Sequence, residues 1–505
     1  MINTENYYLN TFGVSRSLME ELAAEGLRTG GDYSDLFFES TWGSSLMFKD
    51  GEVTFGGFNV DYGVGIRVLK GEKTGYAYSE STSREAMMSA AKAAGAIAGS
   101  SRSDASPARI LTDARDSGSP YVRSDSNGGR PVRKFFTGVP NPAADRYPVL
   151  NDWRTCPTAG QAAFLSKLAN TVTAKDNRIV KVIATLTSQM SDYLMFNSFG
   201  ELKYDTRPLA TVAVSVIFKQ GDDMESKSVS RSWRTGSEML SEELISEIAT
   251  MAVKGIDEKF EARRPNGGKM QVVMGAGASG ILLHEAMGHA FEADFNRKGQ
   301  SIFSDKMGKR ICPKGISIVD DATLRGNRGS LNFDDEGVPG QRTMMVEDGI
   351  LTSYLHDRIS ARFYGVTPTG NGRRESFRYE PLPRMRATYM EGGDADPQDI
   401  IASVKKGIYV DDFTNGQVKI GEGDFTFYVN SGFLIENGHK TMPVKDINII
   451  GNGPQALADI IAVGNDPVVD KGAWTCGKGQ SVPVSCGIPT VLVNGLTVGG
   501  EQAYD

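Results

Sequence analysis

Positive charge is scarce in this chain of 505 residues, in which 62 Asp and Glu outnumber 55 Lys and Arg. Proteins that bind nucleic acid directly normally carry a basic face or tail, and this sequence has neither. Long apolar runs are also missing, since no stretch of about 18 or more apolar residues is present. We therefore expect no direct nucleic-acid partner and no membrane-spanning helix.

Cysteine is scarce as well, with four in the whole chain. Cys156, Cys312, Cys476 and Cys486 form no close-spaced pair, so we expect no disulfide framework, and a reducing compartment fits best. The residues from Met1 to Tyr8 are polar and lack the apolar segment of a signal peptide. These features predict a cytoplasmic protein.

The residues that are present predict a globular α+β protein with two domains. Hydrophobic residues make up 40% of the sequence and charged residues 23%, and 505 residues are too many for one ordinary core. The 58 glycines favour turns and tight loops. A Pro-Asn-Gly-Gly stretch after Arg263-Arg264 marks the predicted joint, which divides residues 1–262 from residues 263–505.

The N-terminal domain is expected to be an α/β layered unit. Strands are predicted at Leu36–Ser40 and Leu46–Phe48, with a hairpin turn at Lys49–Glu52. The Ala-rich segment Ser83–Ala98 contains no proline and predicts a helix. Residues 99–150, rich in Ser, Gly, Asp and Pro, are expected to form an irregular arm. Further helices are predicted at 160–173 and 237–254, and strands at 179–187, 192–197 and 211–219.

The C-terminal domain is expected to be an antiparallel, β-rich sandwich or barrel that carries an inserted metal-binding helix. A short apolar strand, Met270–Met274, leads through a glycine-rich turn into a helix predicted over Ile281–Ala293. Mostly short strands separated by Gly and Asp turns follow, at 341–347, 407–410, 425–430, 445–450 and 490–493.

The segment His284-Glu285-Ala286-Met287-Gly288-His289 offers two imidazoles and a carboxylate, the groups that a catalytic zinc site uses. Its spacing is one residue longer than in the His-Glu-x-x-His motif. At about 100° per residue, histidines five apart diverge by about 140°, so a regular helix would not aim both at one ion. A π-bulge restores the common direction, and we predict a bulged or broken turn at Met287–Gly288, where glycine makes distortion sterically cheap.

Spacing alone fits an ordinary pair of satisfied histidines about as well as a metal site, and a catalytic zinc ion needs a third protein ligand. Glu292 and Asp294 also suit a helix surface, or carboxylates that orient the histidine rings. Cys476 stands in a Gly-flanked turn, where Lys478 is placed to lower its pKa. The candidates for the third ligand are Glu292, Asp294, Cys476, Cys486, His356 and His439, of which the last two look structural.

At these residues the sequence resembles the TldD/PmbA family, which is also named for modulation of DNA gyrase, and within it the TldD branch. The resembling segments keep one order through the C-terminal half: 283–296, 334–340, 367–376, 434–438, 476–480 and 498–500. The N-terminal half matches more loosely, at 49–51 and 63–67, and residues 113–151 depart from the family pattern. Several long matches in one order are far more specific than the histidine motif alone.

The resemblance implies a zinc metallopeptidase with one Zn²⁺ per chain, held by His284, His289 and Cys476, with Glu285 as the catalytic acid and base. It implies unfolded or flexible peptide substrates that are gripped by main-chain strand addition. It also implies a dimer, formed by two copies or with a PmbA- or TldE-like sister chain. The family has two domains, an α/β N-terminal one and a β-rich C-terminal one that carries the site.

Arg373 and Arg374 are further candidates, because a guanidinium binds a substrate carboxylate or an oxyanion. Their simpler role is pairing with Glu375, Glu380 or Asp335 to hold loops together. Two other functions stay open: a non-catalytic peptide-binding subunit with a structural metal that regulates another protein, and a regulator of a DNA enzyme. A structural metal site would be closed by four protein ligands.

Overall fold

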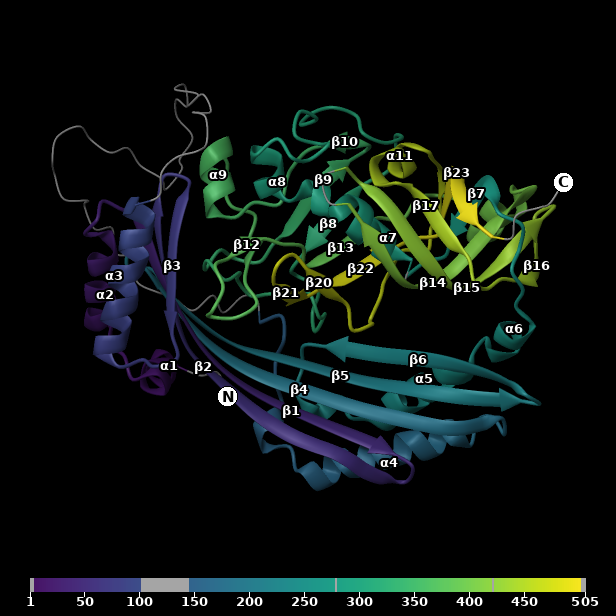
Figure 1. Ribbon diagram of the computed structural model, residues 1–505, viewed down its shortest axis with the longest axis horizontal. Helices are drawn as coiled ribbons and strands as arrows, with labels where there is room; N and C mark the ends of the chain where they lie inside the picture. The colour runs from purple at the N-terminus through teal and green to yellow at the C-terminus, as the bar shows by residue number, and fades with distance from the viewer. Residues whose placement is uncertain (1–3, 101–144, 278, 420–421, 501–505) are drawn as a thin grey trace.

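The computed structural model describes residues 4–100, 145–277, 279–419 and 422–500. Two parts of the chain lie against each other, an N-terminal part around one long curved sheet and a C-terminal part rich in shorter strands (Figure 1). This mixture of helices and sheets confirms the predicted α+β class. Residues 101–144, most of the predicted irregular arm, lie outside the described residues.

The N-terminal sheet has the order β3-β2-β1-β4-β5-β6, and each neighbouring pair is antiparallel. The hairpin turn predicted at Lys49–Glu52 is confirmed. Asp50 and Gly51 both have positive φ, 53° and 89°, which matches the twist of the flanking strands. The strands are β1 (Tyr33–Lys49), β2 (Glu52–Lys70), β3 (Lys73–Ser79), β4 (Ile179–Asn197), β5 (Leu202–Gln220) and β6 (Asp223–Trp233).

β1 is one continuous strand of 17 residues, although the sequence predicted two short strands within it. The residues from Tyr33 to Glu39 are all buried. Helices cover one face of this stretch and the C-terminal part covers the other. Because both faces are buried, apolar and polar residues do not alternate along the strand. The sequence pattern therefore underestimates the length of the strand.

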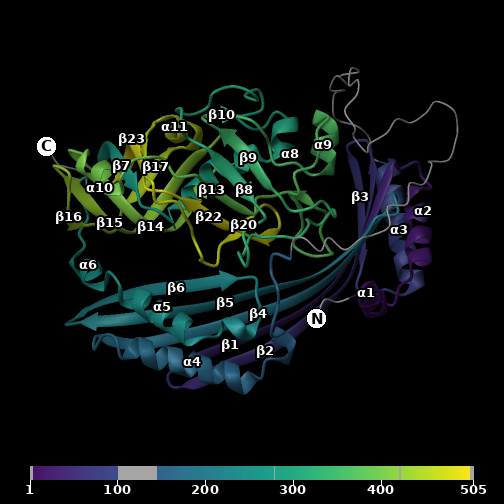
Figure 2. The same cartoon turned by 180° about the vertical axis from the view of Figure 1, so that it is seen from behind.

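Helices cover the face of the sheet that points away from the C-terminal part (Figures 1 and 2). Leu22 of α2 and Met87 of α3 belong to the core at the β1–β3 end, whereas Leu168 of α4 and Ile248 of α5 belong to the core under β4–β6. The helices are α1 (Glu5–Phe12), α2 (Arg16–Leu27), α3 (Arg84–Ser100), η1 (Trp153–Thr155), α4 (Thr158–Thr173), η2 (Ser237–Met239), α5 (Glu242–Val253) and α6 (Ile256–Glu261).

The C-terminal part contains a barrel, one of the two architectures that the sequence predicted. Its main sheet has the order β14-β7-β23-β17-β15-β16, and β14 also pairs with β15, which closes the sheet on itself. β7 and β14 are parallel, a detail that short local patterns do not predict, because it depends on a long crossover between strands far apart in the chain. The strands are β7 (Gly268–Met274), β14 (Lys406–Val418), β15 (Asp424–Glu436), β16 (His439–Pro443), β17 (Asn448–Asn452), β18 (Ile460–Val463) and β23 (Val491–Gly499).

A second sheet packs beside the barrel, in the order β10-β9-β8-β13-β22-β19. One apolar core joins barrel and sheet, and it includes Leu283 and Met287 from the segment that carries the histidine motif. The strands are β8 (Ile318–Asp321), β9 (Arg342–Glu347), β10 (Ile350–Leu351), β13 (Ala387–Met390), β19 (Val468–Val469) and β22 (Ser485–Ile488); two hairpins are β11 (Gly372–Arg373) with β12 (Leu382–Pro383) and β20 (Thr475–Gly477) with β21 (Ser481–Pro483).

The helices of the C-terminal part are short. Outside the histidine segment they are α8 (Ala293–Arg297), α9 (Arg358–Tyr364), α10 (Pro397–Ala402) and α11 (Gly453–Ala458). Among the helices of the described residues, none is both long enough and apolar enough to cross a membrane.

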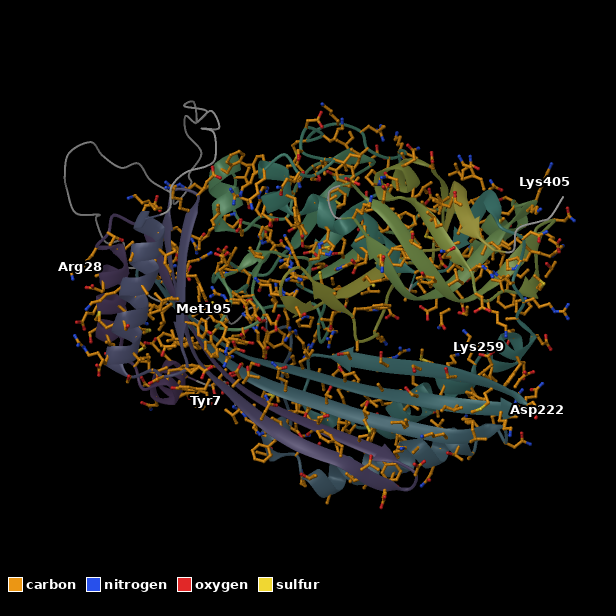
Figure 3. The ribbon with its side chains drawn as sticks, viewed as in Figure 1. Tyr7, Arg28, Met195, Asp222, Lys259 and Lys405 are labelled. Atoms are coloured by element: carbon orange, nitrogen blue, oxygen red, sulfur yellow. The ribbon has the colours of Figure 1, made fainter. Side chains whose placement is uncertain are left out.

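The chain passes from one part to the other through α6 and residues 262–267, which precede β7. Lys259 of α6, labelled in Figure 3, donates to the Ser226 carbonyl in β6 at 2.7 Å and lies 3.5 Å from Asn430 Oδ1 in β15. α6 therefore contacts both parts at the joint. The division into two domains between residues 262 and 263 stays a prediction.

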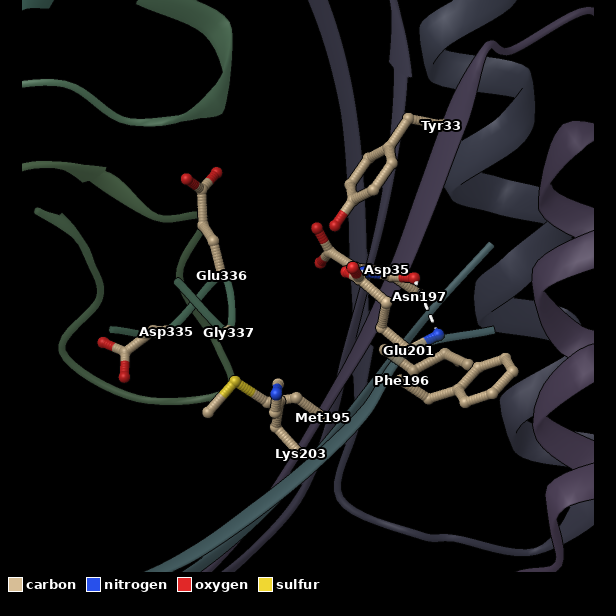
Figure 4. Close-up of a pocket in the computed structure, with 11 residues that line it drawn as sticks. Tyr33, Asp35, Met195, Phe196, Asn197, Glu201, Lys203, Asp335, Glu336 and Gly337 are labelled. Atoms are coloured by element: carbon tan, nitrogen blue, oxygen red, sulfur yellow. Dashed lines mark hydrogen bonds between the residues drawn. The ribbon is translucent and has the colours of Figure 1, made fainter. Parts of the chain in front are cut away.

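Buried charges hold the N-terminal sheet against a loop of the C-terminal part. Arg67 of β2 forms ion pairs with Asp35 of β1 and with Glu336, whose Oε1 lies 2.7 Å from Arg67 Nη1. Arg207 of β5 donates to Asp335 Oδ1 at 2.5 Å. Figure 4 shows Asp35 on the sheet side, and Asp335 and Glu336 on the loop side, of a cavity of about 10 Å³, room for about one water. Ion pairs thus contribute much of the contact between the N-terminal sheet and this loop.

Arg67→Met is expected to destabilise the protein by about 3–5 kcal/mol, because it removes the buried cation that Asp35 and Glu336 share and leaves Asp35 only Arg374 at 3.7 Å. Urea unfolding followed by circular dichroism measures the change. Arg84→Met is the matched control, since Arg84 pairs with Glu21 at the surface, where ion pairs contribute about 0–1 kcal/mol. Equal loss of stability in the two variants would contradict a special role for the buried network.

Candidate metal centre

The helix predicted over Ile281–Ala293 is broken at the histidine motif. α7 (Gly280–Leu282) passes into a π-helical turn, η3 (Leu283–Met287), and then into a 3₁₀ turn, η4 (Gly288–Phe291). The predicted distortion is confirmed. It brings the rings of the two histidines to a centroid distance of 5.4 Å.

The physical basis of the distortion differs from the prediction. Gly288 has ordinary helical angles, φ −61° and ψ −44°, and the unusual backbone is at Met287, with φ −124°. Gly288 is needed for space instead, because a Cβ there would lie 2.2 Å from the Sδ of Met385. Gly280 plays the same part at the start of α7, where a Cβ would lie 2.6 Å from the Gly487 backbone in β22. Gly288 thus lets the turn lie against the Met385 side chain, and Gly280 lets it approach β22 of the second sheet closely.

His284, His289 and Cys476 converge in the interior. All three are buried, and each offers a ligand atom within 4.8 Å of those of the other two. Both ring nitrogens of His284 are buried and have no hydrogen-bond partner in the part of the chain that the structure describes. Such a nitrogen is costly, and a metal ion would satisfy it. Two imidazoles and a thiolate are a donor set that suits zinc.

Polar contacts orient His289. Its Nδ1 lies 2.9 Å from Glu292 Oε2, which leaves Nε2 directed toward the Cys476 sulfur at 3.4 Å. Lys478 donates to the same Glu292 oxygen at 2.9 Å and to Asp294 Oδ1 at 2.8 Å. Burial alone would raise the pKa of Glu292, but Lys478 and His289 lower it to about 2. Glu292 is therefore a charged partner of His289, and Asp294 helps to hold Lys478.

The surroundings of Cys476 in β20 favour a thiolate. Burial by itself raises the pKa of this thiol, but His284 and His289 lower it to about 4. Lys478, predicted to lower this pKa, instead has its ammonium group in ion pairs with two carboxylates. Burial raises the pKa of Cys486 well above its ordinary value, so the other candidate cysteine is a neutral thiol.

Glu285 lies at the edge of the cluster. Its Oε2 is 3.8 Å from His289 Nε2, and 27% of its side chain is exposed. A carboxylate beside the ligand atoms and open to solvent is placed to exchange a proton with a water at that position.

The other two histidines lie in different surroundings. His356 Nδ1 is 3.3 Å from Ser360 Oγ, and burial lowers the pKa of His356 to about 4. His439 is exposed at the start of β16. Neither belongs to the group of converging ligand atoms found in the described residues.

Arg373 and Arg374 are buried between the two parts of the chain. Arg373 donates to the carbonyls of Met385 and Pro483 at 2.6 and 2.8 Å. The backbone N–H of Arg374 donates to Asp335 Oδ2 at 2.8 Å, and its guanidinium donates to the Asp335 carbonyl at 3.0 Å. These bonds hold loops together, as in the simpler of the two predicted roles, and the binding of a carboxylate by either arginine stays a prediction.

Sequence reasoning missed Arg384. This fully buried residue donates to the Cys476 carbonyl at 2.6 Å and to the Gln480 carbonyl at 2.9 Å, and so fixes the backbone of the hairpin that carries the thiol. A signal was present in the stretch Leu382–Met390, where two arginines alternate with apolar residues. Arginines at buried positions need acceptors, and here backbone carbonyls supply them.

Comparisons with known proteins point to one family. Models of three PmbA/TldA metallopeptidase domains match the chain: domain 1 at residues 34–98, the central domain at 152–256 and the C-terminal domain at 267–500. A Haemophilus influenzae protein named Metalloprotease TldD homolog is 37% identical over 477 residues, 93% of each chain. A Saccharolobus solfataricus protein named Zinc metalloprotease TldD homolog is 34% identical over 258 residues, 51% of this chain and 57% of the other.

Solved structures share the fold. TldE from Thermococcus kodakarensis superimposes with a TM-score of 0.70 at 19% identity and covers 96% of this chain and 100% of its own. A Bacteroides thetaiotaomicron protein named for modulation of DNA gyrase gives 0.71 at 20% identity and covers 99% of this chain and 100% of its own.

Lys478→Met is expected to weaken zinc binding by about 10–100-fold, because Glu292 loses the cation that keeps it charged and aimed at His289. Competition with a chromophoric chelator measures the affinity without reference to activity. Lys309→Met removes an exposed lysine and is expected to bind zinc like the parent. Unchanged affinity in Lys478→Met would rule out this support of His289.

Proposed function

The chain belongs to the PmbA/TldD metallopeptidase family, and on that premise we propose that it is a zinc-dependent peptidase acting on unfolded or flexible peptides. The observation that carries the proposal is the buried cluster of His284, His289 and Cys476 beside the partly exposed Glu285. Three protein ligands are typical of catalytic zinc sites, which keep one position open, whereas structural sites use four. The three ligands that the described residues offer therefore favour a peptidase over a subunit with a structural metal.

The side chains have separable roles in the proposed reaction. His284, His289 and Cys476 would hold a zinc ion, which would supply Lewis-acid polarisation of the scissile carbonyl and greater acidity of the attacking water. Glu285 accepts the proton of that water and returns it to the leaving amine. Glu292 keeps the Nδ1 proton of His289, so that Nε2 stays free as a ligand.

We further propose that the substrate is held through its main chain as an added strand, which makes recognition largely independent of side chains. The partner in our proposal is a second copy or a TldE-like chain, and the shared fold with TldE supports a sister chain of similar shape. The four cysteines are free thiols, which suits a reducing cytoplasm.

Glu285→Gln is expected to lower kcat by about 10²–10⁴-fold while zinc content stays unchanged, because the amide cannot accept a proton. Cleavage of a flexible, internally quenched peptide measures the rate, with and without a TldE-like chain. Glu347→Gln, at an exposed position in β9, is the matched control. Equal cleavage by the parent and Glu285→Gln would refute the role of Glu285.

Cys476→Ser is expected to lose the metal, from about one zinc per chain to nearly none at micromolar protein, because a thiolate ligand is replaced by a weak one. Cys486→Ser is the matched control and is expected to keep zinc, since this buried thiol is neutral. Elemental analysis after dialysis measures both. Zinc retained in Cys476→Ser but lost in Cys486→Ser would mean that Cys486, and not Cys476, is the metal ligand.

A further inference from the structure

A second cavity lies between the N-terminal sheet and the C-terminal part. Its volume is about 240 Å³, room for several waters or a small organic acid. Glu39 of β1, Gln189 of β4 and Arg207 of β5 line its sheet side, and Arg373 and Ser481 are among the residues on its other side. This cavity is far larger than the water-sized one beside Asp35.

Positive charge dominates the buried lining of the cavity. Four buried arginines line it, Arg207, Arg234, Arg373 and Arg374, against two buried acids, Glu39 and Asp335, and one exposed acid, Glu375. Arg207 forms ion pairs with Asp335 and Asp205, and Arg374 lies 3.7 Å from Asp35, so these two arginines have carboxylate partners. Burial raises the pKa of Glu39 to about 7, which weakens its negative charge near neutrality. Arginines therefore outnumber acids in the lining, and the positive charge without a carboxylate partner is that of Arg234 and Arg373.

Among the described residues, the hydrogen-bond acceptors of two of these arginines are backbone carbonyls, and Arg234 also lies over the Tyr147 ring at 5.8 Å. Arg234 donates to the Arg328 and Pro208 carbonyls at 3.0 and 3.2 Å, and Arg373 donates to the Met385 and Pro483 carbonyls. Neither forms an ion pair with a carboxylate of the described residues. Burial lowers the pKa of both arginines, and that of Arg373 falls to about 9. A buried guanidinium without a counter-charge is costly, and an anion would remove the cost.

We propose that this cavity is a binding site for a carboxylate, which Arg234 and Arg373 recognise. Guanidinium groups bind carboxylates with two parallel hydrogen bonds, and the amide of Gln189 on the wall adds a neutral donor. The carboxylate is carried by a free organic acid or by a peptide. This site goes beyond the proposed peptidase function and does not rest on it.

The cavity and the metal cluster lie on opposite faces of one hairpin. Cys476 of β20 pairs with Val482 of β21, and Ser481 and Pro483 flank Val482. Because neighbouring side chains of a strand point to opposite faces, Cys476 faces one side and the two cavity-lining residues face the other. Arg373 bonds to the Pro483 carbonyl, so an anion on Arg373 adjoins the backbone that supports the thiol.

Isothermal titration of the full-length, zinc-loaded protein with succinate tests the site, with uncharged succinamide as the analogue and ionic strength held constant. We expect saturable binding of succinate and none of succinamide. Gln189→Glu adds a carboxylate of nearly the same shape to the wall, and we expect it to weaken succinate binding by at least about tenfold through like-charge repulsion. Gln417→Glu adds the same charge at an exposed position of β14 and is expected to bind like the parent.

Peptides identify the source of the carboxylate. A flexible peptide with a free C-terminus and its C-terminal amide are titrated into Glu285→Gln, with succinate as the competitor. If the peptide with the free C-terminus binds, its amide does not, and succinate displaces it, the carboxylate belongs to a peptide. If succinate binds but neither peptide binds, the carboxylate belongs to a free organic acid.

Either assignment supports the proposal when Gln189→Glu weakens that binding by at least about tenfold. Arg234→Gln, checked for folding by circular dichroism, is expected to lose succinate binding as well. This variant tests the cavity as the binding site if Gln189→Glu fails to fold. Absence of saturable binding of both succinate and the free-acid peptide, or equal affinity in the parent and the cavity variants, overturns the site.

Discussion

The ion pairs around Arg67 connect the N-terminal sheet to the loop of Asp335, and the arrangement of the candidate site depends on that connection. Asp335 accepts the backbone N–H of Arg374, and the next N–H in the chain donates to Gln480 Oε1 at 2.8 Å. Gln480 lies in the turn of the hairpin that presents Cys476. Buried charge is costly unless paired, so each member of this series holds its neighbours in one geometry.

The cluster of His284, His289 and Cys476 joins two segments 187 residues apart, and neighbouring contacts support the same junction. Lys478, two residues after the thiol, pairs with Glu292, three residues after His289. Arg384 holds the backbone carbonyl of Cys476. The ligand atoms therefore converge because the surrounding polar contacts already place them, which is the preorganisation that a precise metal site requires.

Charge separates two environments on either side of one hairpin. On the Cys476 side, carboxylates and a thiolate surround the histidines, and the cluster suits a cation. On the Ser481 side, arginines outnumber acids around a larger cavity, which suits an anion. The hairpin is thin, and the carbonyls of its two strands accept bonds from Arg373 and Arg384, so the two environments share one piece of backbone.

The sequence by itself determined the elements whose signals are local. The turn at Asp50-Gly51, the Ala-rich helix α3 and the distorted turn between His284 and His289 could all be predicted, because turn residues, propensity and helical period act over a few residues. The resemblance of ordered motifs, rather than spacing, singled out Cys476. Only the tertiary structure decided the length of β1, the parallel pairing of β7 with β14, the partner of Lys478 and the role of Arg384. Each of these depends on groups far away in the chain, whose burial and pairing arise only when the two parts fold against each other.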